Sequence, residues 1–371
     1  MTKSLVIQGV RGIPAMHGGF ETFAEYLSLY LVARGWDVTV YCQLDKSKTN
    51  LNKYDEDVWC GVRRVFVPVR GDGPLGTIVF DFLSIIHAIR MRSKTVLTLG
   101  YNTAVFNILF RLFGVVNLIN MDGLEWKRSK WSIFHKIYLY INERIGCLVG
   151  TVLVADHPEI EIHLASRVDS KKISMIPYGA RQISDRRMDP LSQFKLSPDK
   201  YIVLIARPEP ENSILEIVQA FSRSSRSIKL VMLGNFSSSN KYHSSVVSAA
   251  SEEVVFLGAI YDKEILDSLR ANALFYIHGH TVGGTNPSLV EALGAGQATI
   301  AHDNKFNRWV AGDSALYFRS VDDCARIFDH FLSQIDRVHK MRSKASERFA
   351  ELFTWDIVLG QYEKLLYKYS L

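Results

Sequence analysis

The sequence predicts an α/β protein with two doubly wound parallel-sheet halves that face a central cleft. Short apolar runs alternate with amphipathic stretches along most of the 371 residues, which is typical of parallel strands covered by helices. The alternation stops at the polar residues 181–200, which contain two prolines, and then starts again. A chain of this length fits about two domains. We therefore expect domains at residues 1–180 and 181–354.

The first half opens with a strand, a glycine-rich loop and a helix. Residues 4–8 form an apolar run of β type, and glycines punctuate residues 9–19. Apolar residues recur with a helical period over 20–34, where Gly35 ends the helix. Residues 37–42 supply the second strand, so the chain begins with a strand–helix–strand unit.

The same pattern predicts the later elements. In the first half, strands are expected at 62–69, 95–99, 115–120, 151–155 and 173–177, and helices at 80–91, 104–113 and 132–146. In the second half, strands are expected at 201–206, 229–233, 254–257, 273–277 and 298–301, and helices at 214–222, 263–271 and 287–293. Ligands of such sheets bind at the carboxyl ends of the strands.

Composition excludes several classes of protein. Hydrophobic residues make up 47% and charged residues 22%, which excludes a mainly disordered chain. The four cysteines lack the spacing of a zinc site or a disulfide scaffold and fit a reducing compartment. The most apolar stretch, residues 96–118, is interrupted by Asn102, Asn107 and Arg111, so no membrane span is expected. The N-terminus reads as a first strand rather than a signal peptide, which predicts a cytoplasmic protein.

The charge is unevenly distributed. The formal net charge is +6, and residues 1–180 hold 21 basic against 16 acidic residues, whereas the rest hold 23 against 22. A basic half suggests an anionic partner such as a nucleic acid, a membrane surface or a phosphorylated ligand. Ordinary solubility explains a charge of this size equally well.

The loop after the first strand is a candidate anion site. Gly18 and Gly19 allow close approach of a ligand to the backbone, and Glu21 follows at the start of the helix. The glycine spacing matches neither the dinucleotide fingerprint nor a phosphate-binding loop with Gly-Lys-Ser/Thr. A plain strand–helix turn is an equally good interpretation.

Two candidates follow strands of the second half. Arg207 ends the first strand, where its planar guanidinium suits a diphosphate, although a surface salt bridge is an equal alternative. After a later strand come His278 and His280, then Asn286 as the N-cap of a helix that carries Glu291. The two histidines lack an obvious third ligand, which argues against a metal.

Acidic residues of the first half form two groups. Asp122 and Glu125 follow a strand and precede aromatic and basic residues, among them Trp126. Asp122 is either a functional carboxylate or a loop acid that caps the turn. The triplet at residues 55–57 reads as a solvated loop.

Together these motifs resemble one enzyme family. The stretches GVRGIPAMHGGFE, NMDGLEWKRSKW, ARPEPEN, FLGAIYD and HGHTVGGTNPSLVEA are similar, in this order, to the rhamnosyltransferase-type branch of glycosyltransferase family 4. The resemblance implies a GT-B fold of two Rossmann-like domains, in which the C-terminal helix at 355–371 crosses back to the first domain. It also implies retaining sugar transfer from a nucleotide sugar, dTDP-L-rhamnose, onto a saccharide or polyprenyl-diphosphate-linked acceptor in cell-surface polysaccharide synthesis. No metal or cofactor and no nucleic acid are implied.

The resemblance assigns roles to matching residues. Glu291 would bind the nucleotide ribose and Arg207 the diphosphate, where Arg207 would also stabilise the leaving group. Gly18 and Gly19 would approach the phosphates and the acceptor. Asp122 would lie near the transferred sugar, as the catalytic carboxylate. On the acceptor side we expect Glu21, Glu125 and Trp126.

Two positions depart from the wider family. Gly283 stands where a second glutamate is usual, and Asn212 where a diphosphate lysine is usual. To replace them, we expect backbone N–H and hydroxyl groups from Gly283, Gly284, Thr285 and Asn286, and charge from His278 or His280.

The residues also bear on mechanism. No positioned nucleophile is evident, which fits a front-face reaction in which the leaving phosphate takes the acceptor proton. Two alternatives remain: a nucleotide-sugar epimerase of the same fold, and a non-catalytic membrane-associated protein that binds sugar nucleotides.

One segment suggests attachment to a membrane. The stretch from Trp126 to Arg144 combines five basic residues and one acid with apolar side chains at helical spacing. It predicts peripheral binding to an anionic membrane, on the inner face of the plasma membrane. The alternative is that the apolar stripe packs inside the first domain and only the charges are exposed.

Overall fold

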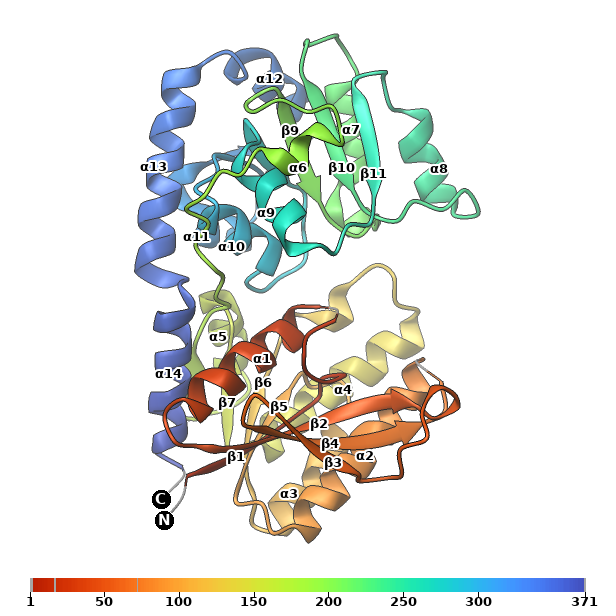
Figure 1. Cartoon of the computed structure of the whole chain (residues 1–371), viewed down its shortest axis with the longest axis vertical. Helices are drawn as coiled ribbons and strands as arrows, with labels where there is room; N and C mark the ends of the chain where they lie inside the picture. Colours follow the sequence, from red (N-terminus) through yellow and green to blue (C-terminus); the bar gives the residue numbers. More distant parts are fainter. Residues whose placement is uncertain (1–2, 17, 72, 370–371) are drawn as a thin grey trace. The chain divides into compact units, whose positions relative to one another are not determined.

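The computed structural model describes residues 3–16, 18–71 and 73–369 (Figure 1). The chain forms two compact units. The N-terminal unit contains residues 1–127, 131–178 and 355–371, and the C-terminal unit contains residues 128–130 and 179–354.

The N-terminal unit is built on an eight-stranded sheet in the order β3-β4-β2-β1-β5-β6-β7-β8. Its pairs are parallel except for the antiparallel pair of β3 and β4. The strands are β1 Ser4–Gln8, β2 Asp37–Asp45, β3 Glu56–Trp59, β4 Val62–Val69, β5 Thr95–Leu99, β6 Val116–Asn120, β7 Val152–Ala155 and β8 Ile173–Met175. The helices are α1 Gly19–Val32, α2 Pro74–Arg90, α3 Ile108–Leu112, α4 Ile133–Val149, α5 Pro158–Ala165 and α14 Trp355–Tyr367, with the 3-10 turns η1 Lys46–Lys48, η2 Ala104–Asn107, η3 Glu125–Lys127 and η4 Ser170–Lys172.

The C-terminal unit holds a parallel six-stranded sheet in the order β11-β10-β9-β12-β13-β14. The strands are β9 Tyr201–Ile205, β10 Lys229–Leu233, β11 Val254–Gly258, β12 Phe275–His278, β13 Thr299–His302 and β14 Ala315–Phe318. The helices are α6 Asp189–Ser192, α7 Ile214–Phe221, α8 Lys241–Ser248, α9 Lys263–Ala271, α10 Pro287–Gly294, α11 Lys305–Ala311, α12 Val321–Phe331 and α13 Ile335–Leu352, with the 3-10 turns η5 Pro210–Asn212 and η6 Gly312–Ser314.

The last helix packs into the N-terminal unit. Apolar side chains of α14 join the core that also contains residues of β1, α1 and β2. The Trp355 ring stacks on Tyr26 with centroids 4.7 Å apart, and the Tyr362 hydroxyl accepts a hydrogen bond of 2.9 Å from the Asn120 side chain. The C-terminal segment is therefore part of the N-terminal core, although the whole stretch from Gly179 to Thr354 belongs to the other unit.

The predicted α/β architecture with two parallel-sheet units is confirmed, and one local prediction is wrong. The acidic triplet at 55–57 is not a loop, because its last two residues begin β3. This exposed edge strand lacks apolar alternation, and Asp57 forms an ion pair with Arg64 on the neighbouring strand. The polar residues 181–200, where the alternation stops, contain the short helix α6, in which Leu191 is buried. The remaining unpredicted elements are α5, α8, α11, α12, α13 and β14.

A buried acid in α2 makes stability depend on pH. Asp81 is buried, its Oδ2 accepts a hydrogen bond of 2.7 Å from Thr103, and its Oδ1 has no partner among the described residues. Burial raises the pKa of Asp81 to about 7, above the usual value of about 3.9 for an unfolded chain.

We therefore expect the free energy of unfolding to fall as the pH rises from about 4 to about 7. In that range the folded chain holds a proton that the unfolded chain has released, so the loss amounts to about 2–4 kcal/mol and levels off above about pH 7. Urea unfolding of the wild type and of Asp81→Asn across this range measures it. The variant should lack this slope, and parallel pH profiles for the two proteins would contradict the assignment.

Candidate active site

Both sheets have a switch point, where the strand order reverses and ligands of doubly wound sheets bind. In the C-terminal unit the chain proceeds from β9 through β10 to β11, and returns so that β12 lies on the other side of β9. Arg207 follows β9, and the stretch from His278 to Glu291 follows β12. The predicted donor-binding residues of this unit therefore come from the two strands that flank its switch point.

Asn212 connects these two loops. Its Nδ2 donates a hydrogen bond of 2.7 Å to the carbonyl of Arg207, and its Oδ1 lies 2.8 Å from Nδ1 of His280. Because an amide oxygen only accepts, Nδ1 of His280 carries the proton. Gly279 permits this contact, since a Cβ there would lie 2.0 Å from the Asn212 carbonyl oxygen. Asn212 thus positions the backbone of Arg207 instead of supplying a cation.

The burial of the two histidines disfavours the positive charge that the sequence analysis expects of them. His278 and His280 are buried. Burial lowers the pKa of His280 to about 3, with a further contribution from the nearby Arg207, and burial lowers the pKa of His278 well below its usual value. Both rings are therefore neutral near pH 7. Nε2 of His278 has no hydrogen-bond partner in the part of the chain that the structure describes, so within it this ring has one unused donor or acceptor atom.

The N-terminus of α10 is organised as the sequence predicts. Asn286 is the N-cap, and its Oδ1 accepts a hydrogen bond of 3.0 Å from the Ser288 backbone N–H, while Pro287 occupies the first helical turn. Gly284 just before the cap has a φ of +117°, which favours glycine, and Thr285 is buried. This eight-residue helix directs its free N–H groups and partial positive charge toward the loop that carries the candidate site.

Glu291, one turn into α10, has a partner that the sequence did not reveal. Its Oε2 forms an ion pair with the guanidinium of Arg270, which lies in α9 and is buried. The Glu291 carboxylate is about one third exposed, so it remains accessible while Arg270 fixes its orientation. A carboxylate held in this way can accept hydrogen bonds from a pair of neighbouring hydroxyls.

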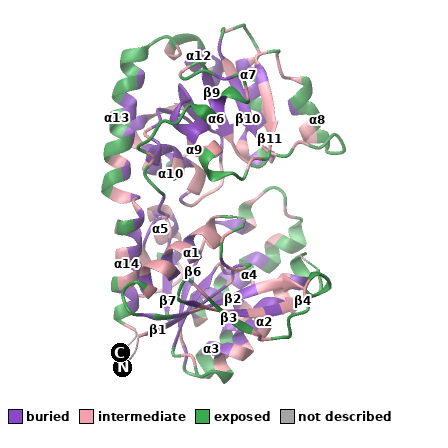
Figure 2. Ribbon diagram, in the orientation of Figure 1, coloured by how far each residue is buried: buried purple, intermediate pink, exposed green. Residues whose placement is uncertain are grey.

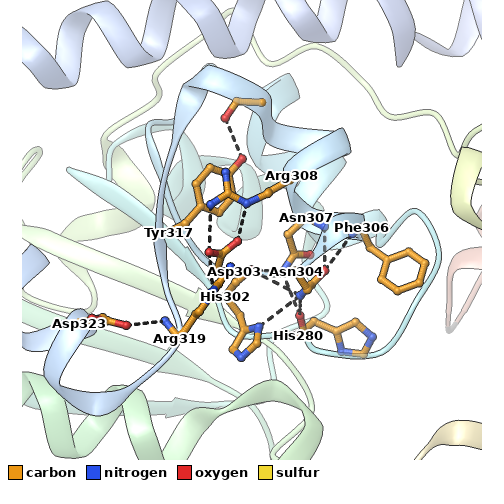
Figure 3. Close-up of polar contacts among 11 residues, drawn as sticks. His280, His302, Asp303, Asn304, Phe306, Asn307, Arg308, Tyr317, Arg319 and Asp323 are labelled. Carbon is orange, nitrogen blue, oxygen red and sulfur yellow. Dashed lines mark hydrogen bonds and ion pairs between the residues drawn. The ribbon is translucent and has the colours of Figure 1, made fainter.

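The Phe306 ring takes the space where the wider family carries its second glutamate. A Cβ at Gly283 would lie 2.2 Å from Cζ of Phe306, so a side chain at this position requires the Phe306 ring to move. The ring is placed by α11, whose N-cap Asn304 accepts the Phe306 backbone N–H at 3.0 Å. Figure 3 shows Phe306 beside the loop of His280. The departure at Gly283 is therefore coupled to an aromatic residue 23 positions later.

The loop after β13 supports the same site (Figure 3). Side-chain amides of Asn304 and Asn307 donate hydrogen bonds of 3.0 and 2.9 Å to the carbonyl of His280. Next to them, Asp303 pairs with Arg308 and Arg319, and the hydrogen bonds of Arg308 lower the pKa of Asp303. These residues hold the His280 loop, and none of them was a predicted site residue.

Gly283→Ala is expected to reduce the free energy of unfolding by about 1–3 kcal/mol, because the added methyl group must displace the Phe306 ring. Phe306→Leu removes the ring edge that causes the clash. In a double-mutant cycle measured by urea unfolding, the two changes should therefore be less damaging together than the sum of the single effects. Strict additivity would show that Phe306 is not what restricts this position.

The glycine-rich loop follows β1, which flanks the switch point of the N-terminal sheet beside β5. Gly18 has a φ of +83°, and a Cβ there would lie 2.7 Å from Oε2 of Glu21, so the turn requires glycine. Glu21 lies in the first turn of α1, and its Oε1 accepts a hydrogen bond of 3.4 Å from the Arg11 N–H. Gly19 begins α1, and His17 lies outside the described residues. In the structure Glu21 helps to shape the loop predicted to bind the ligand.

Asp122 follows β6 in the N-terminal unit and has a φ of +50°. Its backbone N–H donates to Oδ1 of Asn120 at 3.0 Å, and its side chain is half-buried. Tyr101, buried beside it, donates its hydroxyl to the Gly123 carbonyl at 3.3 Å and accepts the Glu125 N–H at 3.0 Å. Burial raises the pKa of Tyr101, and the negative charge of Asp122 raises it further. Tyr101 is therefore neutral near pH 7, and its two hydrogen bonds fix the turn that carries Asp122.

The predicted acceptor-side residues Glu125 and Trp126 have partners inside the unit. Oε1 of Glu125 accepts a hydrogen bond of 3.3 Å from the Trp131 indole, and the Trp126 indole donates to Oε2 of Glu143 at 2.6 Å. Burial would raise the pKa of Glu143, but hydrogen bonds from His163, Trp126 and Arg167 hold it below its usual value. These contacts anchor the segment after Asp122. Among the described residues, no group of three His, Cys, Asp or Glu side chains is placed to hold a metal ion.

The sequence matches two known families, one in each half. Residues 2–181 match a domain of unknown function (DUF1972), and residues 188–348 match Glycosyl transferases group 1. No curated protein matches the chain.

Solved structures with the same fold extend over nearly the whole chain. Sucrose-phosphate synthase from Thermosynechococcus elongatus has a TM-score of 0.82 at 16% identity, with 99% of each chain covered. HepE from Anabaena, in complex with UDP and glucose, has a TM-score of 0.77 at 12% identity, covering 99% of this chain and all of that one. An alpha,alpha-trehalose 6-phosphate synthase from Burkholderia multivorans has a TM-score of 0.78 at 10% identity, covering 99% of this chain and 97% of that one.

These likenesses show that the chain has the GT-B fold, as the sequence predicted. In the C-terminal unit, residues 188–348 are similar to Glycosyl transferases group 1.

Proposed function

We propose that the protein is a retaining rhamnosyltransferase that moves L-rhamnose from dTDP-L-rhamnose onto a lipid-linked saccharide in cell-surface polysaccharide synthesis. One observation supports the choice of donor site. Arg207 and the N-terminus of α10 follow β9 and β12, the two strands that flank the switch point of the C-terminal sheet. The related HepE structures contain UDP and UDP-glucose, which supports a nucleotide sugar as the donor.

The proposed chemistry follows from the charges that develop on the leaving diphosphate and on the sugar ring during transfer. The bond between the sugar C1 and the diphosphate oxygen breaks, and C1 joins the acceptor oxygen on the same face of the ring. The acceptor proton passes to the departing diphosphate, so no protein nucleophile is needed. Arg207 and the free N–H groups in the first turn of α10 oppose the negative charge of the diphosphate, and the carboxylate of Asp122 stabilises the cationic sugar ring. We propose that the reaction needs no metal.

The choice of a 6-deoxy sugar has separate support. The Phe306 ring fills the position at which the wider family has a carboxylate, so this part of the loop offers an apolar surface. An apolar ring suits a methyl group better than a hydroxyl, because a buried hydroxyl without a partner is costly.

Two other activities use the same residues. A nucleotide-sugar epimerase would release nucleotide without any acceptor, and a binding protein would release none. The braced carboxylate of Asp122 favours transfer, because a protein that only binds nucleotide sugars needs no fixed acid in its other unit.

Incubation with a panel of nucleotide sugars, with and without a lipid-linked saccharide, tests the proposal. We expect dTDP release from dTDP-L-rhamnose only when acceptor is present, the same rate in EDTA, and a product with the anomeric configuration of the donor. Acceptor-independent release would indicate the epimerase, and binding without turnover of any donor would indicate the binding protein.

A lipid-linked acceptor places the enzyme at a membrane, so the proposal includes peripheral attachment at its cytoplasmic face. Within the described part of the chain, no helix combines the length and apolar character needed to cross a bilayer. The proposed attachment is the binding of a surface of the folded protein to the bilayer.

A further inference from the structure

Large apolar side chains are exposed mainly on one helical layer of the N-terminal unit. Of the twenty-three such residues in the described part of the chain, thirteen belong to α2, α3 with its C-cap, and α4. Figure 2 shows exposed residues along α3 and α4. We call these thirteen residues the apolar face: Leu75, Val79, Phe82, Ile108, Leu112, Phe113, Ile133, Phe134, Ile137, Tyr138, Tyr140, Ile141 and Leu148.

The three helices that carry these residues are neighbours. Phe82 on α2 contacts Phe106 in η2, with ring centroids 5.2 Å apart. Next along the chain, the Val105 N–H donates to Oδ1 of Asn142 on α4 at 3.0 Å. The turn η2 and helix α3 therefore lie between α2 and α4, and α3 contacts both helices.

The exposure of α4 is not explained by packing within the chain. Its inner side is already buried through residues such as Leu139 and Gly146. Its outer stripe of Phe134, Ile137 and Ile141 nevertheless consists of large apolar residues, with Phe134 80% exposed. A helix that is apolar on both sides requires a second apolar environment on its outside. The alternative in which the predicted stripe packs inside the domain does not hold for these three residues.

The charge on this layer has a single sign. The two carboxylates within α2, η2, α3 and α4 are Asp81 and Glu143, and both are buried. Arg90 and Arg111 are exposed in the last turns of α2 and α3, and on α4 Arg144 is exposed and Lys136 is half-buried. An apolar face with basic residues and no exposed acid suits an anionic lipid surface. A second copy of this chain fits less well, because two basic faces repel each other.

We propose that this apolar face, with Arg90, Arg111, Lys136 and Arg144, docks on an anionic lipid bilayer. The apolar residues enter the interfacial region, and the basic residues contact the headgroups. The contact thus shifts from the predicted segment at Trp126 toward α2, α3 and the exposed stripe of α4, because the Trp126 indole is engaged by Glu143. This inference rests on the proposed function in one respect: the proposed acceptor is lipid-linked and so requires the enzyme at a membrane.

Flotation of the full chain with vesicles tests the surface. We expect binding to vesicles of phosphatidylcholine with 30% phosphatidylglycerol at low salt, and much weaker binding to pure phosphatidylcholine. The triple variant Phe134→Ser, Ile137→Ser and Ile141→Ser should reduce the partition coefficient at least tenfold. Replacing Arg111, Lys136 and Arg144 by Ser should reduce it at low salt by roughly fivefold for each charge.

A matched control changes three apolar residues that are exposed on the C-terminal unit: Val247→Ser, Tyr261→Ser and Ile335→Ser. This variant should bind vesicles like the wild type, and circular dichroism should show all variants folded. The inference is overturned if the wild type does not bind anionic vesicles, or if the control and the α4 variant lose binding equally. It is also overturned if the wild type self-associates through α4 without binding vesicles.

Nucleotide release with a water-soluble acceptor tests the proposed reaction independently of membrane binding. The α4 variant should keep its turnover on a soluble saccharide while losing vesicle binding. A wild type that binds vesicles through this face but turns over no sugar would overturn the proposed reaction and leave the surface intact.

Discussion

Arg207→Ala should lower kcat/KM for the nucleotide sugar by about 10- to 100-fold. Its carbonyl is fixed by the Asn212 side chain and by the Glu209 N–H, each at 2.7 Å, whereas its side chain is exposed and pairs with no carboxylate in residues 3–16, 18–71 and 73–369. The guanidinium is thus positioned by its backbone and available to a diphosphate. Charge-assisted hydrogen bonds of this kind contribute about 1.5–3 kcal/mol each.

Steady-state kinetics and calorimetric binding of the nucleotide measure this effect. Arg207→Lys should fall between the wild type and the alanine variant, because it keeps the charge but loses the planar fork. Arg187→Ala is the matched control, since Arg187 lies on the same unit and forms a surface pair with Glu264. Near-normal kinetics in a folded Arg207→Ala protein would show that Arg207 is a surface arginine that does not bind the diphosphate.

The parallel strands were predictable because their signal is local. Strands at 4–8, 62–69, 95–99 and 229–233 have the predicted limits, since each is a short run rich in apolar and β-branched residues between polar turns. The cap of α10 was predictable for the same reason, because Asn286 and Pro287 are adjacent in the sequence. The edge strand β3 was missed because its exposed, charged residues carry no apolar period.

The partners within the site could not be predicted, because they come from distant parts of the chain. Arg270 reaches Glu291 from α9, and Phe306 reaches Gly283 from α11. Neither pair has a spacing that indicates contact. A weak signal existed for Phe306, because an unusual glycine suggests that a bulky neighbour occupies its space. The neutral state of His278 and His280 depends on burial, which only the folded unit determines.

The N-terminal unit shows a second limit of prediction from sequence, which concerns the side of a helix that faces the core. The sequence identified apolar and basic residues from Trp126 to Arg144 but left open whether the apolar stripe faces the core. The structure divides this segment: Leu139 is buried, Phe134 is exposed, and the Trp126 indole is bonded to Glu143. Helical periodicity alone cannot make this division, because α4 is apolar on both sides. The contributions of α2 and α3 to the same face become evident only from the packing of the three helices.

Asp122→Asn should lower kcat by about 100-fold or more while changing donor affinity less than threefold. Asp122 has a φ of +50°, a region that asparagine tolerates as well as aspartate does. The variant therefore keeps the turn, with its N–H bonded to Asn120 and Tyr101 bracing the neighbouring residues. What it loses is the negative charge, which would stabilise the cationic sugar in the transition state and contributes little to the bound donor.

Parallel measurement of kcat, donor Kd and urea unfolding distinguishes this role from that of a capping acid. Asp185→Asn is the control for charge, since Asp185 is an exposed acid of the other unit, outside the candidate site. Asp122→Ala should in addition lose stability, because alanine is strained at a positive φ. If Asp122→Asn reduces the free energy of unfolding but leaves kcat within twofold of the wild type, the carboxylate serves the turn and the stabilising charge must come from elsewhere. Loss of kcat at unchanged stability and donor affinity instead assigns to this carboxylate the chemical step of the transfer.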